Sequence, residues 1–166
     1  MEMNTCPYLN AKARVDRLVA DEARASDEGR RHDVDRIEAM LDDALPLMRG
    51  AVPATLASAR TKLEDALTRL DGWEHLTYEG PELDRRRPDE AEFEAVYIYG
   101  AIAAGIRAID SGEASAIPAL DAALYVCERS TFPGCRPADE LASVLTALRQ
   151  FKLDQQAADA DTPAYA

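Results

Sequence analysis

Apolar residues recur with the period of an α-helix along almost the whole chain, and no stretch alternates in the manner of a β-strand. The two clearest apolar stripes are Val34, Ile37, Leu41, Ala44, Leu45 and Met48, and then Leu56, Ala59, Leu63, Ala66, Leu67 and Leu70. Each stripe gives a helix one apolar face, which must pack against a neighbouring element. The pattern therefore predicts an all-α fold, a single-domain bundle of about six helices arranged mostly as antiparallel hairpins.

Turn and capping residues divide the first half of the chain into three helices. We expect the first over residues 10–25, with a break at Gly29, and the next two over residues 31–47 and 53–70. Pro46 is expected to kink or end the second helix, because proline lacks the backbone N–H that a helix needs. The second and third helices are joined by few residues, so we expect them to pack as an antiparallel hairpin.

The second half of the chain carries three further helix starts. We expect helices to begin at Pro88, near Ser115 and at Pro137, because proline suits the first turn and serine caps it. Residues 1–154 are predicted to form a single helical domain. Residues 155–166 are small and polar, so they are predicted to be a frayed tail.

The segment between the third and fourth helices is predicted to be a long connection, residues 71–87. It contains Gly72, Gly80 and Pro81, three consecutive arginines, and the cluster Trp73, His75 and Tyr78. Connections of this length without secondary structure are uncommon and are often functional. We therefore expect this connection to contribute to the functional surface.

The helix that begins at Pro88 is the most apolar, so we expect it at the centre of the bundle. Ala101 and Gly105 are small enough for another helix to approach closely, and one alternative is a homodimer formed through this helix. Tyr97 and Tyr99 lie on opposite sides of it, and one of them is expected to reach the surface.

The formal net charge is −12, from 31 acidic and 19 basic residues. This excess disfavours binding to nucleic acid or to an anionic membrane, both of which need clustered Lys and Arg. It favours a basic protein partner, because opposite fields steer association. Acidity that serves only solubility is the other interpretation, since the abundance of Ala and Arg is typical of a GC-rich bacterial genome.

We find none of the strong sequence motifs for catalysis or for metal or cofactor binding in this chain. We find no phosphate-binding glycine loop, no zinc or redox spacing among Cys6, Cys127 and Cys135, and no nucleophile elbow. We therefore predict neither a cofactor nor a metal. No secretory signal is visible, so the cytoplasm is the expected location.

An acidic, helical, cytoplasmic profile of this kind is similar in type to that of many bacterial immunity proteins and antitoxins. We expect a non-enzymatic inhibitor that binds a basic, toxin-like protein, aided by the acidic starts of the fourth and sixth helices. The predicted partner-binding residues are Trp73, Glu74, His75, Tyr78, Glu79, Glu82, Asp84, Asp89 and Glu90. The alternative is an enzyme or small-ligand binder that uses His75 and Glu74 as the polar groups of a pocket.

Overall fold

The structure is a computed structural model that describes the chain over residues 6–77, 88–111, 116–129 and 137–160; within these ranges the side chains of 69–77, 88–96, 159 and 160 are not described. The described residues form six α-helices and the connections between some of them, and no strand occurs among these residues. The helices are α1 (Pro7–Asp27), α2 (Arg31–Gly50), α3 (Leu56–Thr77), α4 (Pro88–Asp110), α5 (Ala116–Arg129) and α6 (Ala138–Ala160). The predicted all-α bundle is confirmed.

The break between α1 and α2 is made by a glycine-terminated helix end. Gly29 has a φ of +71°, a left-handed conformation that a glycine adopts without steric cost. The N–H of Gly29 donates to the carbonyl of Ser26 at 3.0 Å, and that of Arg30 to Ala25 at 2.9 Å. These bonds satisfy carbonyls that the last turn of α1 would leave without partners. The predicted break at Gly29 is therefore confirmed.

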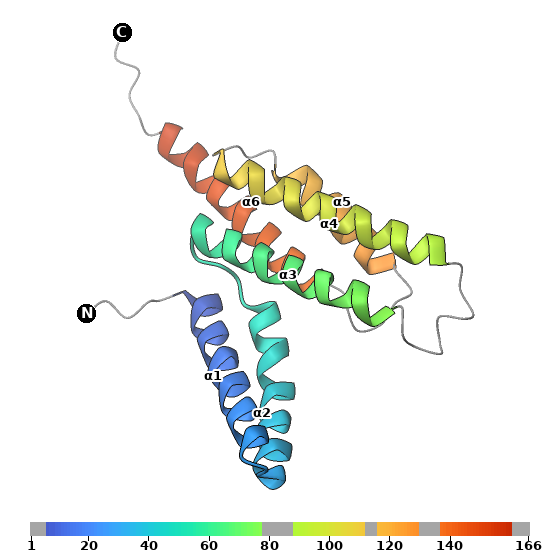
Figure 1. Ribbon diagram of the computed structural model, residues 1–166. Helices are drawn as coiled ribbons and strands as arrows, with labels where there is room; N and C mark the ends of the chain where they lie inside the picture. The colour runs from blue at the N-terminus through green and yellow to red at the C-terminus, as the bar shows by residue number, and fades with distance from the viewer. Residues whose placement is uncertain (1–5, 78–87, 112–115, 130–136, 161–166) are drawn as a thin grey trace.

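Helices α1 and α2 form a hairpin, residues 7–50, whose tip points away from the other helices (Figure 1). The hairpin has an apolar cluster of its own. The buried members are Cys6, Tyr8, Val15, Leu18, Ala25, Ile37, Ala44 and Met48. The predicted stripe of α2 faces this cluster, because its other members, Val34, Leu41 and Leu45, also pack against it.

Helices α3 to α6 form a four-helix bundle in which each helix packs mainly against two neighbours, in the ring α3–α4–α5–α6. Its buried cluster consists of Ala59, Leu63, Ala66, Ile98, Ile102, Ala116, Leu120, Ala123, Cys127, Leu141, Val144, Leu145 and Leu148. Helices α4 and α5 approach closely at Gly105, where an added Cβ would lie 2.7 Å from Leu120 Cδ2. The expected close approach at Gly105 therefore occurs within the chain.

Three details of the predicted arrangement are wrong. Helix α2 packs along α1 and against α6 rather than folding back along α3. Of the two effects expected of Pro46, the ending of the helix does not occur, because α2 continues to Gly50. Helix α6 extends to Ala160, so residues 155–160 are helical rather than frayed; the glutamines and alanines there are good helix formers.

Candidate functional site

The predicted partner-binding segment begins inside a helix. Trp73, Glu74 and His75 belong to the last turns of α3, which runs to Thr77, so the prediction of a connection from residue 71 is wrong. Gly72 lies inside α3, and a single glycine in a helix costs only about 1 kcal/mol, which the helix tolerates. The side chains of these three residues are outside the described part of the chain.

The remaining predicted residues are divided between the undescribed segment and α4. Tyr78, Glu79, Glu82 and Asp84 lie outside the described residues. The structure describes Asp89 and Glu90 only by their backbone, in the first turn of α4. Within that helix Glu90 and Tyr97 are seven residues apart, which is about two turns, so they occupy the same side of the α4 backbone.

Two tyrosines follow this acidic stretch on the surface of α4. Tyr97 is 42% exposed and Tyr99 is 38% exposed, so both reach solvent where the sequence predicted only one. A third exposed tyrosine, Tyr125 on α5, lies against its own helix, with the guanidinium carbon of Arg129 3.5 Å from the ring centroid. Among the aromatic residues whose side chains the structure describes, Tyr97 and Tyr99 lie nearest in sequence to the predicted partner-binding residues.

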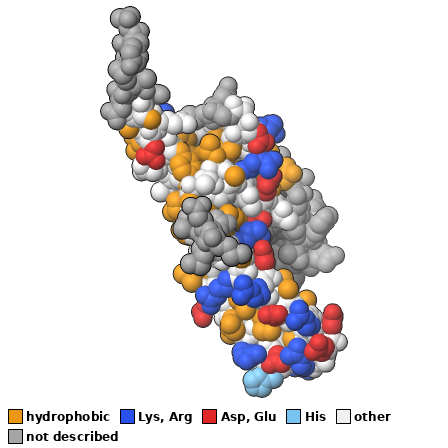
Figure 2. Space-filling view, turned by 90° about the vertical axis from the view of Figure 1, so that its left-hand side faces the viewer, with side chains coloured by type: hydrophobic (Ala, Val, Ile, Leu, Met, Phe, Trp, Pro, Cys, Tyr) orange, Lys and Arg blue, Asp and Glu red, His pale blue; other side chains and the backbone are white. Residues whose placement is uncertain are grey.

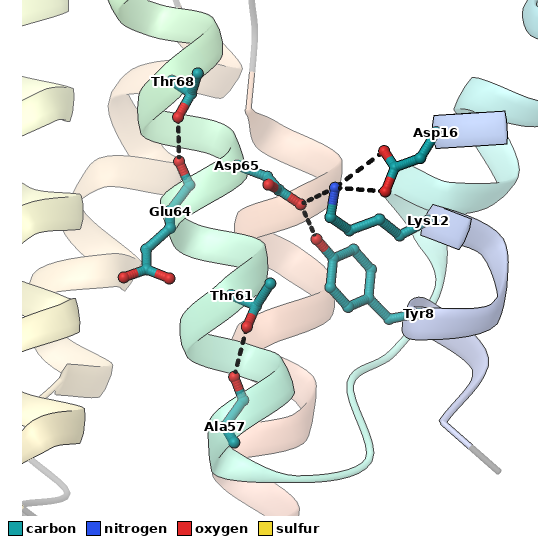
Figure 3. A network of polar contacts seen from close by, with 8 residues as sticks. All are labelled: Tyr8, Lys12, Asp16, Ala57, Thr61, Glu64, Asp65 and Thr68. Atoms are coloured by element: carbon teal, nitrogen blue, oxygen red, sulfur yellow. Dashed lines mark hydrogen bonds and ion pairs between the residues drawn. The ribbon is translucent and has the colours of Figure 1, made fainter. Parts of the chain in front are cut away.

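A second concentration of polar side chains lies where the hairpin meets the bundle (Figure 3). The hydroxyl of Tyr8 on α1 donates to the carboxylate of Asp65 on α3. Lys12 Nζ lies 3.5 Å from that same carboxylate and 3.0 Å from Asp16, one turn further along α1. Burial lowers the pKa of Lys12, but hydrogen bonds and charge from Asp16 and Asp65 outweigh it and raise the pKa above its ordinary value. This network fixes the start of α1 to α3.

Lys62 is a fully buried lysine of α3 that closes the end of α2. Its ammonium group donates to the carbonyl oxygens of Arg49 at 2.7 Å and Ala51 at 2.5 Å. These are among the carbonyls that the last turn of a helix leaves without intrahelical partners, and they carry the negative end of the helix dipole. The ammonium group also lies 5.0 Å from the centroid of the Tyr8 ring. Lys62 therefore contacts α1 and α2 from α3.

Helix α6 completes the attachment of α2. The hydroxyl of Ser143 lies 3.4 Å from the Arg49 carbonyl oxygen, and Arg49 Nε lies 3.6 Å from Glu140 Oε1. The acidic start of the sixth helix was expected to help bind a partner. Glu140 is buried, so this expectation is wrong for Glu140, whereas the neighbouring Asp139 is exposed. A buried carboxylate needs a close cation, and Arg49 provides that charge.

Cys6 is buried at the N-terminus of α1, next to the start of α3. The N–H of Ala54 donates to its Sγ at 3.5 Å. Burial raises the pKa of the Cys6 thiol, but contacts with Ser58 and with backbone N–H groups outweigh that effect, so the pKa lies below its ordinary value. The thiol is thus part of the contact between α1 and the 51–55 connection.

We call these contacts the polar junction, which comprises Tyr8, Lys12, Arg49, Lys62, Asp65, Glu140 and Ser143. Its groups bind one another and the end of α2, so the chemistry we assign to it is the positioning of helices. Sequence analysis missed it, although one signal was present. Lys62 follows Ala59 by three residues and precedes Ala66 by four, so it is a lysine on an apolar helical face.

Charge is distributed unevenly between the hairpin and the α3–α4 region. Acidic and basic side chains intermingle on the hairpin (Figure 2), where residues 6–50 contain ten acidic and eight basic groups. Residues 69–96 contain nine acidic and four basic groups, all four of them arginine. The acidic excess is therefore stronger where the partner-binding residues were predicted than along the hairpin.

The chain matches no model of a known protein family, no curated protein and no solved structure. Among the described residues, no helix combines the length and the apolar character that crossing a bilayer requires.

Proposed function

We propose that this protein is a cytoplasmic, non-enzymatic inhibitor of the bacterial immunity or antitoxin type, which binds a basic, toxin-like partner protein. The proposed surface is the acidic segment 69–96 together with Tyr97 on α4. The observation that carries the proposal is that Tyr97, 42% exposed, follows this segment on the same side of the α4 backbone as Glu90.

The chemistry of the surface favours a cationic protein. Carboxylates at close spacing attract a basic surface from a distance and speed the encounter. Tyrosine then supplies a large, rigid contact with one polar atom, which is why tyrosines are common among the residues that dominate binding energy. The exposed Tyr97 beside an acidic stretch therefore combines the features expected of an anchor and of a steering field.

The test is capture of a partner with the full-length protein. The tagged chain is incubated at low salt with extract from its source cells, and the bound proteins are identified by mass. The partner is then purified and its affinity measured for the wild type, for Tyr97→Ser and for Tyr125→Ser. Tyr125 is the matched control, because it is an exposed tyrosine on a different helix.

We expect a stoichiometric basic partner whose affinity falls about tenfold or more with Tyr97→Ser, since loss of a central aromatic anchor costs about 2 kcal/mol or more. Tyr125→Ser is expected to change the affinity less than about twofold, because a peripheral contact contributes little. Capture of no basic protein, or equal effects of the two substitutions, would contradict the proposal.

A further inference from the structure

We propose that the α1–α2 hairpin opens from the α3–α6 bundle as one cooperative unit, hinged at residues 51–55, while its own apolar cluster stays packed. The first observation is that the buried apolar clusters of hairpin and bundle share no residue within the described chain. Units with separate cores can open independently of each other. This inference does not depend on the partner proposed above.

The contacts between the two units gather at one end of the hairpin. Tyr8 and Lys12, near the start of α1, contact Asp65, and the end of α2 at Arg49 contacts α3 and α6. At the opposite end, Arg30 makes its ion pairs within the hairpin, with Glu28 and Asp33. A helix of 20 residues is about 30 Å long. The hairpin therefore contacts the bundle near the start of α1 and the end of α2, and the turn between α1 and α2 points away from the bundle (Figure 1).

The attachment includes several polar contacts. Asp65 accepts from Tyr8 and pairs with Lys12, while Lys62 donates to two backbone carbonyls. Polar groups that separate can exchange their mutual hydrogen bonds for bonds to water, so the net cost of each separation is small. Opening at this junction is therefore easier than opening at a purely apolar interface, which would expose its whole area to water.

The proposed hinge lies between two fixed ends. Ala51 is extended and follows directly after α2. At the other end, the Ser58 N–H donates to Thr55 Oγ1 at 3.1 Å and the Thr55 N–H donates to Ser58 Oγ at 3.0 Å. This reciprocal cap holds the first turn of α3 through residues of α3 and of the connection, and Cys6 of the hairpin adds a contact to Ala54 and Ser58. A rotation of the hairpin can therefore be absorbed within residues 51–55 while α3 stays intact.

Native-state hydrogen exchange of the full chain, at low denaturant concentrations, tests this proposal. We expect the slowly exchanging amides of the hairpin to exchange through one shared opening reaction. This opening should occur more often than the opening that exposes the slowly exchanging amides of α6. Asp65→Asn is expected to raise exchange in the hairpin about tenfold and leave α6 unchanged, because it weakens a charged contact of the junction.

The control is Asp110→Asn, which removes an exposed ion pair between α4 and α3, Arg60 Nε to Asp110 at 2.6 Å. This substitution is expected to leave unchanged the ratio of the hydrogen-exchange rate in the hairpin to the rate in α6. Tyr8→Phe is a milder second variant, because it removes the hydroxyl and keeps the ring, and it is expected to raise hairpin exchange about threefold. A single opening shared by hairpin and α6 would overturn the proposal, as would equal acceleration of both by Asp65→Asn or Tyr8→Phe.

Discussion

The ammonium group of Lys62 lies 5.0 Å from the centroid of the Tyr8 ring, although the two residues belong to helices on different sides of the junction. The same ammonium group donates to two carbonyls at the end of α2. A cation that lies over an aromatic face and is shielded from water is attracted to it more strongly than one at the surface. Lys62 thus connects the bundle to both helices of the hairpin through a single charged group.

Replacement of Lys62 by Met should destabilise the protein by about 2–4 kcal/mol. Methionine fills a similar volume but cannot donate to the carbonyls of Arg49 and Ala51, so the Ala51 carbonyl loses this donor and the Arg49 carbonyl keeps only the longer bond from Ser143. Urea unfolding followed by circular dichroism measures the change. Lys152→Met is the control, because Lys152 is exposed on α6, and a change within about 0.5 kcal/mol is expected there. Equal stability of the two variants would contradict the role assigned to Lys62.

Two glycines of α4 should respond to alanine in opposite directions. A Cβ on Gly105 would lie 2.7 Å from Leu120 Cδ2 and 3.0 Å from its Cγ, and Leu120 is fully buried. Gly105→Ala should therefore destabilise the fold by about 1–3 kcal/mol. A Cβ on Gly100 meets nothing within 4 Å, so Gly100→Ala should stabilise by about 0.5–1 kcal/mol through helix propensity.

Thermal unfolding of the two alanine variants beside the wild type measures both signs in one experiment. A stabilised Gly105→Ala protein would show that α4 and α5 do not approach as closely as the structure has them.

The contribution of Lys12 to stability should disappear at high pH. Its pKa in the folded protein is raised above the ordinary value of 10.5, because Asp16 and Asp65 outweigh the opposing effect of burial. The folded state therefore holds the proton more tightly than the unfolded chain. It follows that the stabilisation is fully present below pH 10.5 and is lost as the pH rises through the folded value.

The free energy of unfolding of the wild type and of Lys12→Met, measured from pH 7 to pH 12, tests this expectation. We expect a difference of about 0.5–1 kcal/mol at neutral pH, as for partly exposed ion pairs, that shrinks above about pH 10.5. A difference that stays constant up to pH 12 would contradict the pairing of Lys12 with the two carboxylates.

The sequence was sufficient to predict the helices and most of their starts, because periodicity and capping are local properties. Pro88 begins α4 as expected, and Gly29 separates α1 from α2. The pairing of helices was less predictable. The connections on either side of α2, residues 28–30 and 51–55, are both short, so their length did not reveal that α2 packs along α1 rather than α3.

The polar junction was beyond sequence analysis for a different reason. Lys62 binds backbone carbonyls of Arg49 and Ala51, and a backbone acceptor leaves no side-chain pattern to find. Asp65 pairs with Tyr8 across 57 positions of the chain, a relationship that only the packing of α1 against α3 creates. By contrast, the acidic excess of residues 69–96 is visible in the sequence itself.

The measurement that tests the proposed function most directly is the association rate with the captured partner, determined between 20 and 300 mM salt. Binding steered by the acidic segment should slow by about tenfold or more across this range, because salt screens charges beyond about one Debye length. The double substitution of Asp89→Asn and Glu90→Gln should lower the rate at low salt and flatten its salt dependence. A wild-type association rate that is independent of salt would contradict the proposal that an acidic surface recognises a basic partner.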